Sequence, residues 1–299
     1  MLNNIKNISL IAALFVSSSA IASVTTADFH SNNITGESSS AFNQFSLTVD
    51  GIDINVSAWS DTKNSSSNGI NANGNDNDAD PFIERAYDLD PNRNGWSMIN
   101  QDERNTRNCG YSHSADNLAN NNCNYQDYDF FLLEFSAAVA LSEAFYSWAY
   151  GQNNSTDGDV VASRNQVSVA AISSDSAGSI DGNTWGNIGS DTTTTSNYSQ
   201  LYHDGNYSHH YYSNIGVVGE GNANNLAGVY SNFWLIGALN ASAFGGETDW
   251  EGNDGMKLAG VKFTTSQQLP ATSVPEPSTI ALFGLAIVGL FASSRKKLK

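Results

Sequence analysis

Cysteine, proline and basic residues are scarce in this chain of 299 residues. It contains 2 cysteines, 5 prolines and 13 lysines and arginines, against 30 aspartates and glutamates. Charged residues make up only 14% of the chain, whereas a typical globular domain has about 25%. The net charge of −17 excludes nucleic acid as a partner bound by charge. Two cysteines are also fewer thiols than a structural zinc site usually has.

The signature motifs of common enzyme classes are absent as well. The sequence has no G-x-S-x-G elbow, no H-E-x-x-H helix, no phosphate-binding loop and no dinucleotide fingerprint. Glu134 and Glu143 are the conceivable carboxylate pair of a glycosidase, in which retaining enzymes need two acids about 5 Å apart. Acids are common on surface strands, so we predict no catalytic residues and no enzymatic activity. A secreted hydrolase is kept as the third hypothesis.

The N-terminus has the layout of a secretory signal. Lys6 precedes an apolar run over residues 8–16, and small residues lead to Ala20-Ile21-Ala22, the A-x-A pattern that signal peptidase accepts. A polar stretch rich in Asn and Ser follows at once, which argues against a buried N-terminal helix. We predict a signal peptide over residues 1–22 and a mature chain that begins near Ser23.

The C-terminus combines a proline motif, an apolar segment and a basic end. Pro275-Glu276-Pro277 is followed by an uncharged apolar segment and then by Arg295, Lys296, Lys297 and Lys299. A helix over residues 278–294 measures about 26 Å, barely enough for a hydrocarbon core of about 30 Å. Positive charge stays cytoplasmic, so the preceding domain faces outward. We predict a transmembrane helix over 278–294 that anchors the chain transiently, and a basic tail over 295–299.

This tripartite end resembles the PEP-CTERM sorting domain, with residues 271–299 as the signal and 275–277 as its motif. The resemblance implies that an exosortase, an intramembrane cysteine protease, cleaves near the motif and releases or re-anchors the protein at the surface. Gly95-Trp96, residues 129–135 and residues 230–238 also resemble one group of exosortase-dependent surface proteins. That group implies a location rather than a chemistry: an intermediate anchored in the inner membrane, then the cell surface or extracellular space.

The exported region, residues 23–270, reads as one β domain. Residues 42–49 and 52–59 flank Asp50-Gly51 and predict a hairpin. Further strand candidates lie at residues 130–135, 137–141, 144–150, 166–172, 233–239 and 256–263. Many short strands with few helices predict an all-β fold, an antiparallel β-sandwich of the jelly-roll type. Residues 62–80 and 175–197, rich in Asn, Ser, Gly and Thr, are expected to be long surface loops.

Cys109 and Cys123 lie in the exported region, where the compartment is oxidising. A bridge between them closes a loop of about 15 residues and stabilises the fold by roughly 3 kcal/mol in the chain-entropy model. A redox pair usually has the spacing C-x-x-C, which this pair lacks. We predict a structural disulfide.

Two segments carry candidate binding residues. Asp90, Asn92 and Asn94 alternate before Gly95, as in a calcium loop, but Gln101 stands where such a loop has Glu. Calcium binding and an ordinary turn rich in Asn and Asp both remain open. The second segment interleaves His203, His209 and His210 with tyrosines, and its candidates for stacking on sugar rings are Tyr202, Tyr207, Tyr211 and Tyr212.

We therefore expect a non-enzymatic, exosortase-sorted protein of a Gram-negative cell surface or biofilm matrix. No cofactor is expected apart from the calcium left open above. Signal peptidase and exosortase are the expected partners during export. The main alternative is a module that binds exopolysaccharide, with or without calcium, which requires Trp185 and the tyrosines over residues 198–212 to line one exposed face.

Overall fold

A computed structural model gives the fold of the exported region. It describes residues 23–29, 43–63, 82–92, 95–101, 114–117, 127–150, 159, 161, 165–204, 210–216, 226–246, 252 and 254–266. Within these ranges the secondary structure consists of strands and three short helices. The helices are α1 (Ser174–Gly178), α2 (Trp185–Ser190) and α3 (Ala241–Phe244). The strands are β1 (Val24–Asp28), β2 (Gln44–Val49), β3 (Ile52–Lys63), β4 (Phe82–Arg85), β5 (Asp88–Asn92), β6 (Gly95–Ile99), β7 (Ala115–Asp116), β8 (Asp129–Ala149), β9 (Gln166–Ile172), β10 (Thr195–Gln200), β11 (Tyr202–His203), β12 (Tyr211–Asn214), β13 (Ser231–Ala238) and β14 (Gly255–Thr265).

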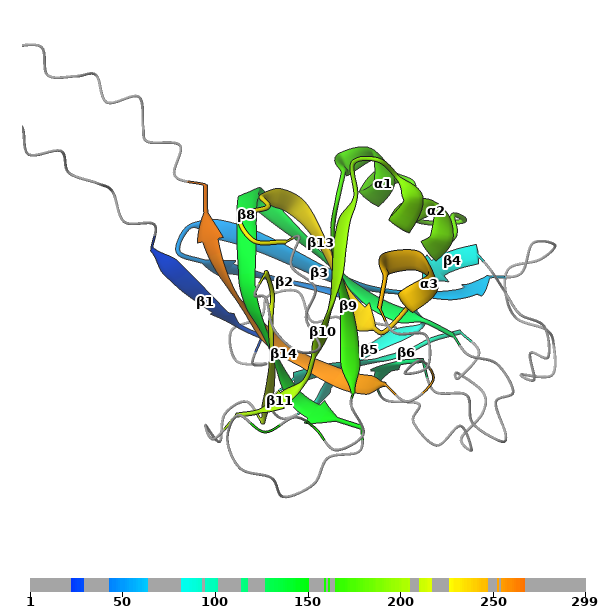
Figure 1. The fold of residues 1–299 in the computed structure, drawn as a ribbon, viewed down its shortest axis with the longest axis horizontal. Coiled ribbons are helices and arrows are strands. Elements are labelled where there is room, and N and C mark those ends of the chain that lie inside the picture. Colours follow the sequence, from blue (N-terminus) through cyan, green and yellow to red (C-terminus); the bar gives the residue numbers. More distant parts are fainter. Residues whose placement is uncertain are drawn as a thin grey trace, which may run out of the picture.

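The long strand β8 organises the sheet (Figure 1). Its first half pairs with β3 and β13, and its second half pairs with β12 and β14. The sequence predicted three strands in this stretch, but one strand of 21 residues runs through all of them. The side chains that enter the larger core change parity between Leu141 and Ala144, where the pairing with β14 shifts register, and the strand continues through this irregularity.

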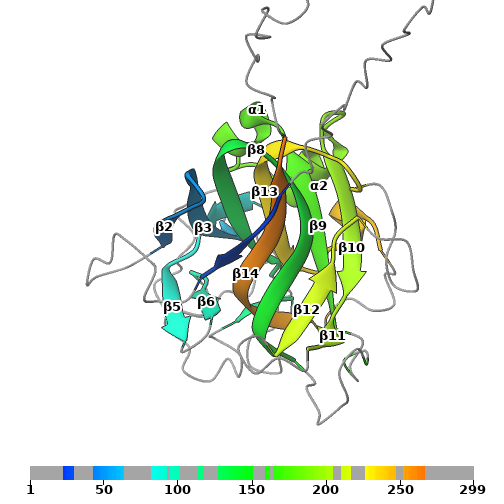
Figure 2. The same ribbon diagram turned by 90° about the vertical axis from the view of Figure 1, so that its left-hand side faces the viewer.

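All strand pairs are antiparallel and belong to one connected sheet of 14 strands. The main path runs β10-β9-β13-β8-β14-β6-β5, and the other strands attach to it (Figure 2). The prediction of an all-β protein is confirmed. The jelly-roll sandwich of two separate sheets is not, because the long strands of this structure are joined in a single hydrogen-bonded network.

The predicted hairpin at Asp50-Gly51 is confirmed. Val49 pairs with Ile52, and the two connecting residues have φ values of 52° and 78°. Positive φ at both positions is the requirement of a type I′ turn, whose twist matches that of the flanking strands. The signal was readable because only a few residue types tolerate this backbone conformation.

The larger core lies on the inner face of the bent sheet. Alternate residues of β3, β8, β9, β13 and β14 contribute to it, with Phe131, Trp234 and Phe263 among the fully buried side chains. Trp96 stacks on Phe45 with ring centroids 4.3 Å apart and donates its Nε1 hydrogen to the Phe29 carbonyl at 2.7 Å. These contacts connect β6 to the N-terminal strands.

The three helices cover a second core on the outer face of the same sheet. Trp185, Ile188 and Phe244 from the helices pack on Phe130 and Leu132 of β8. The expectation of a long surface loop over residues 175–197 is therefore wrong. The isolated apolar residues of this segment are buried, and side chains of Ser173 and Thr184 cap α1 and α2 by accepting backbone N–H groups at 3.1 Å.

The first and last strands lie side by side. Val24 pairs with Thr264 and Asp28 with Gly260, so the start of β1 lies next to the end of β14 (Figures 1 and 2). Thr25 and Ala27 point inward, and Phe29 follows them into the core. The two ends of the folded domain thus leave from the same edge of the sheet.

Candidate functional site

The predicted tyrosine cluster divides between the core and the surface. The rings of Tyr202 and Tyr212 stack on each other across β11 and β12, 5.6 Å apart and inclined by 27°. Tyr211 is buried in the core, which corrects its prediction as a sugar-stacking residue. Tyr207 lies outside the described residues.

Trp185 is also buried, with 3% of its surface exposed, and donates its Nε1 hydrogen to the Tyr128 carbonyl at 3.0 Å. The requirement that Trp185 and the tyrosines share an exposed face is therefore not met. His203 packs beside Tyr211, and burial lowers the pKa of its imidazole.

The predicted calcium segment begins as a strand hairpin. Asp90 pairs with Ser97 and Asn92 with Gly95, so only residues 93 and 94 connect β5 to β6. A calcium loop wraps its ligands around the ion, whereas Asp90 here lies in a paired strand. Asp90 is close enough to raise the pKa of Lys257, although burial of that ammonium has the larger, opposite effect. Asn94 lies outside the described residues.

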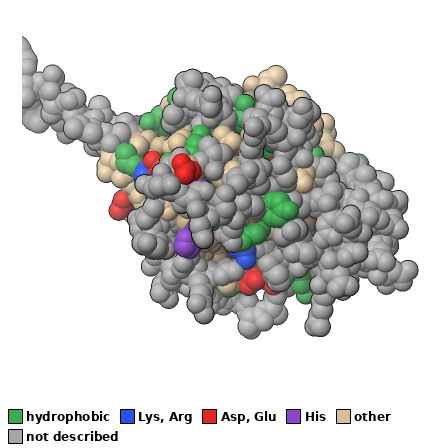
Figure 3. Space-filling model, turned by 60° about the horizontal axis from the view of Figure 1, so that its bottom comes forward, with side chains coloured by type: hydrophobic (Ala, Val, Ile, Leu, Met, Phe, Trp, Pro, Cys, Tyr) green, Lys and Arg blue, Asp and Glu red, His purple; other side chains and the backbone are tan. Residues whose placement is uncertain are grey.

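Within the described ranges no three His, Cys, Asp or Glu side chains converge to hold an ion. Figure 3 brings the lower side of Figure 1 forward, and on it the described charged side chains are scattered among hydrophobic and neutral polar ones.

The buried acid Asp129 and the half-buried acid Asp61 form a feature that sequence reasoning missed. Asp129, at the start of β8, accepts hydrogen bonds from the Asp116 backbone at 3.2 Å and from Asn100 Nδ2 at 3.4 Å. Asp61 accepts one from the Tyr128 backbone at 2.6 Å. Burial raises the pKa of Asp61 to about 7 against this hydrogen bond, and the charge of Asp129 adds to the rise. Burial also raises the pKa of Asp129.

Another buried carboxylate, that of Asp254, holds several strand ends together. Asp254 accepts the Gln166 backbone N–H at 2.6 Å and Asn117 Nδ2 at 2.9 Å. Asn117 Nδ2 also donates to the Leu239 carbonyl at 2.7 Å. Because these partners come from distant parts of the chain, the network joins the starts of β9 and β14 to the end of β13. We assign it a structural role.

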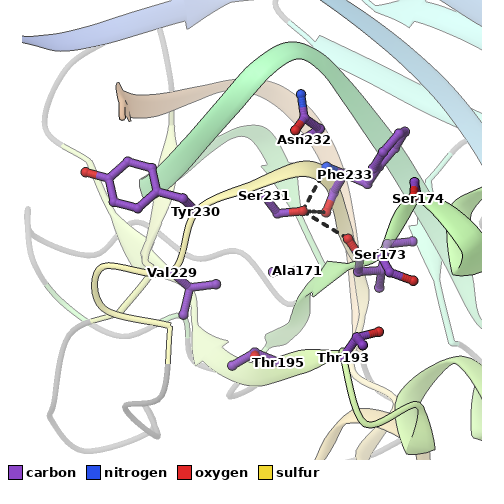
Figure 4. A pocket seen from close by; sticks show the side chains of 11 residues that line it. Ala171, Ser173, Ser174, Thr193, Thr195, Val229, Tyr230, Ser231, Asn232 and Phe233 are labelled. Carbon is purple, nitrogen blue, oxygen red and sulfur yellow. Dashed lines mark hydrogen bonds between the residues drawn. The ribbon is translucent and has the colours of Figure 1, made fainter. Parts of the chain in front are cut away.

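A groove of about 320 Å³ opens between the end of β9, the start of β10 and the start of β13 (Figure 4). Its lining is rich in hydroxyl groups and contains no charged side chain. The lining residues are Ala171, Ile172, Ser173, Ser174, Thr193, Thr195, Val229, Tyr230, Ser231, Asn232 and Phe233. None of them was predicted as a site residue, because they come from three separate segments and form no sequence motif.

The two glutamates weighed as a glycosidase pair lie on β8. Glu143 forms an ion pair with Lys262 of β14, with 2.6 Å between Oε2 and Nζ. Glu134 pairs in register with Asn55 and Phe233 in the other half of the strand. Nine positions along a strand correspond to about 30 Å of extended chain. That spacing does not favour a convergent pair.

Several predicted residues lie outside the described ranges. They include the signal peptide, both cysteines of the predicted disulfide, and the whole sorting signal with Pro275, Glu276, Pro277, Arg295, Lys296 and Lys297. Among the described helices, none is long and apolar enough to cross a membrane. The transmembrane helix and the disulfide remain predictions.

Comparison with known proteins identifies the C-terminal segment as a sorting signal. Residues 273–296 match the family model described as the PEP-CTERM protein-sorting motif. The prediction of this signal is confirmed, and it implies that the chain is exported, processed by exosortase and sorted to the cell surface. Neither a curated protein nor a solved structure matches the chain. The resemblance of the exported region to one group of exosortase-dependent surface proteins stays a prediction.

Proposed function

We propose that this chain is a non-enzymatic protein of the cell surface or biofilm matrix, held transiently in the inner membrane before exosortase acts. The observation that supports this most is the position of the sorting motif relative to the last strand. β14 ends at Thr265, and residues 266–274 separate it from Pro275. Nine residues reach at most about 32 Å, so the folded domain stays close to the membrane until the signal is cut.

The pairing of β1 with β14 supports a common location for the start and the end of the folded domain. Val24 begins β1 two positions after Ala22, the last residue of the predicted signal peptide, and it pairs with Thr264. Both cleavage sites therefore flank one pair of adjacent strands. A domain so attached can complete its sheet while a C-terminal helix holds it at the outer face of the membrane.

The hydrolase hypothesis receives less support. Glu143 is paired with Lys262, and both side chains are only about 30% exposed. The Glu143 carboxylate is thus occupied by an ion pair within the sheet, which leaves it less available to act on a substrate.

Localisation tests the proposed function. We would replace Pro275 and Pro277 by alanine in the native host and compare the fraction of protein in the inner membrane, on the surface and in the matrix. We expect the variant to accumulate in the inner membrane, while wild type reaches the surface and matrix. Equal distribution of the two proteins would refute sorting by this motif.

A second candidate function is the binding of exopolysaccharide, with or without calcium. The groove between β9, β10 and β13 favours it, since its uncharged polar lining suits a carbohydrate. The hairpin at Asp90 gives no specific support to calcium assistance.

A further inference from the structure

We propose that the groove at the start of β13 binds a neutral glycan, with Tyr230 and Thr195 as specificity residues. This inference deepens the second candidate function and rests on it. It does not depend on the tyrosines of β11 and β12.

An exposed aromatic ring stands at the rim of the groove. Tyr230 is 45% exposed, and with Val24 it is one of two large hydrophobic residues that are exposed in the described ranges. Figure 4 shows its ring extending outward beside the groove. Tyrosine presents an apolar face with a polar tip, which suits the C–H face of a sugar ring flanked by hydroxyls. An aromatic ring left in solvent next to a polar groove points to a partner there.

The groove also offers hydrogen-bonding groups to a ligand. Ser231 is not available, because its hydroxyl contacts the Ile172 and Phe233 carbonyls at 2.9 and 3.0 Å and accepts the Phe233 N–H (Figure 4). Ser174 and Thr195 are different: their hydroxyls make no hydrogen bond in the part of the chain that the structure describes. Each can both donate and accept.

Asn232 adds an oriented acceptor. Its Nδ2 donates to the Phe135 carbonyl at 2.9 Å, which fixes the direction of the amide. The Oδ1 atom of Asn232 is left to accept from a ligand. A set of hydroxyls and an amide oxygen matches the donor and acceptor pattern of a polyol.

The absence of charge in the lining of the groove favours a neutral ligand. No charged side chain lines the groove, and the nearby Asp191 is engaged by the hydroxyls of Ser176 and Thr193 at 2.6 and 2.8 Å. A phosphate or metal ion would find no counter-charge. The net charge of −17 also repels acidic polysaccharides. A neutral glycan therefore fits better than an acidic one.

The walls of the groove are fixed by strand pairing. Phe233 pairs with Ile172, and Thr195 pairs with Ala171, so the three segments hold their spacing without a ligand. Such preformed sites lose little freedom on binding. Ser231 and Thr265 both pair with Val139, so the groove lies near the edge from which the chain continues toward the sorting signal.

Calorimetric titration of the processed protein from its host tests this inference. The probes are cellohexaose, maltohexaose, the neutral fraction of the host's exopolysaccharide, and polygalacturonate as the acidic comparison. We expect saturable binding of at least one neutral probe, with Kd in the micromolar to millimolar range, and no binding of polygalacturonate. Silence with all neutral probes would overturn the proposal.

Variants locate the site. Tyr230→Ala and Thr195→Val should each weaken binding about tenfold, and both positions are exposed enough to leave the fold intact. The matched control is Tyr202→Ala, which removes a half-buried tyrosine of β11 that does not line the groove and should bind as wild type. Loss of binding in Tyr202→Ala alone would overturn the assignment in favour of β11 and β12. Surface sorting is measured separately, so failure of the glycan site leaves that result unaffected.

Discussion

Val24 of the first strand is paired with Thr264 of the last, so the sheet closes its N-terminal edge only when residue 264 has left the translocation channel. The sheet can therefore be completed just before the sorting motif reaches the membrane. The last strand is completed immediately before the segment that leads to the sorting motif. A domain that lacks this pairing should be less stable and more exposed to proteases near the membrane.

Gly260→Ala tests the β1–β14 contact. A Cβ atom at this position would lie 2.4 Å from the Ala27 carbonyl oxygen, and a backbone atom cannot move aside cheaply. We expect a loss of about 1–3 kcal/mol of unfolding free energy. Urea unfolding followed by tryptophan fluorescence measures it.

Gly178→Ala is the matched control. No atom lies within 4 Å of the added Cβ, and the residue is the last of α1. Alanine has the higher helix propensity, so stability should stay equal or rise by up to about 1 kcal/mol. Equal unfolding midpoints for the two variants would contradict the account of the β1–β14 contact.

The strands were largely predictable, and the path of the chain between them was not. The segments at residues 166–172, 233–239 and 256–263 carry apolar or alternating runs that mark β9, β13 and β14. The sequence did not indicate that β8 is one continuous strand, because irregularities along it interrupt the alternation of buried and exposed side chains. The helical segment over residues 175–197 was hidden because Trp185 and Ile188 stand alone among polar residues, although Ser173 and Thr184 were readable as caps.

Asp61 should make the protein less stable as pH rises. Its folded pKa of about 7 lies above the ordinary 3.8, so the folded state keeps a proton that the unfolded chain has lost. The contribution is fully present below about pH 4 and is lost as pH rises through 7, to the extent of several kcal/mol. Asp61→Asn should remove this dependence, because an amide oxygen can still accept the Tyr128 N–H.

Unfolding free energies at about pH 4, 6 and 8 measure the effect. We expect Asp61→Asn to match wild type at the lowest pH and to exceed it at the highest. Asp191→Asn serves as control: hydrogen bonds from Ser176 and Thr193 lower the pKa of that exposed carboxyl, so its contribution is lost only at acidic pH. Parallel curves for Asp61→Asn and wild type would refute the assignment.

The candidate sites were less predictable than the strands, for a physical reason. The groove needs Thr195, Tyr230 and Asn232 to meet, and only the strand order β10-β9-β13 brings them together. The Asp61 and Asp129 carboxyls meet because β3 pairs with β8. Conversely, Tyr202 and Tyr211 looked alike in sequence, but the alternation of strand side chains places Tyr211 in the core.

The predicted Cys109–Cys123 bridge has a direct chemical test. Intact mass of the secreted protein should rise by about 2 Da on reduction, and the Cys109→Ser, Cys123→Ser double variant should lose roughly 3 kcal/mol of stability. Cys109→Ser alone should form intermolecular dimers through the remaining thiol. Two alkylatable thiols in unreduced wild type would contradict the bridge.

The C-terminus of the protein recovered from the cell surface tests the central claim most directly. Peptide mapping by mass spectrometry, in the native host with and without its exosortase, would locate the end of the chain. We expect a terminus close to Pro275 in the wild-type host, and a chain that ends at Lys299 in the membrane of the exosortase mutant. A surface protein that retains residues 278–299 in both strains would contradict it.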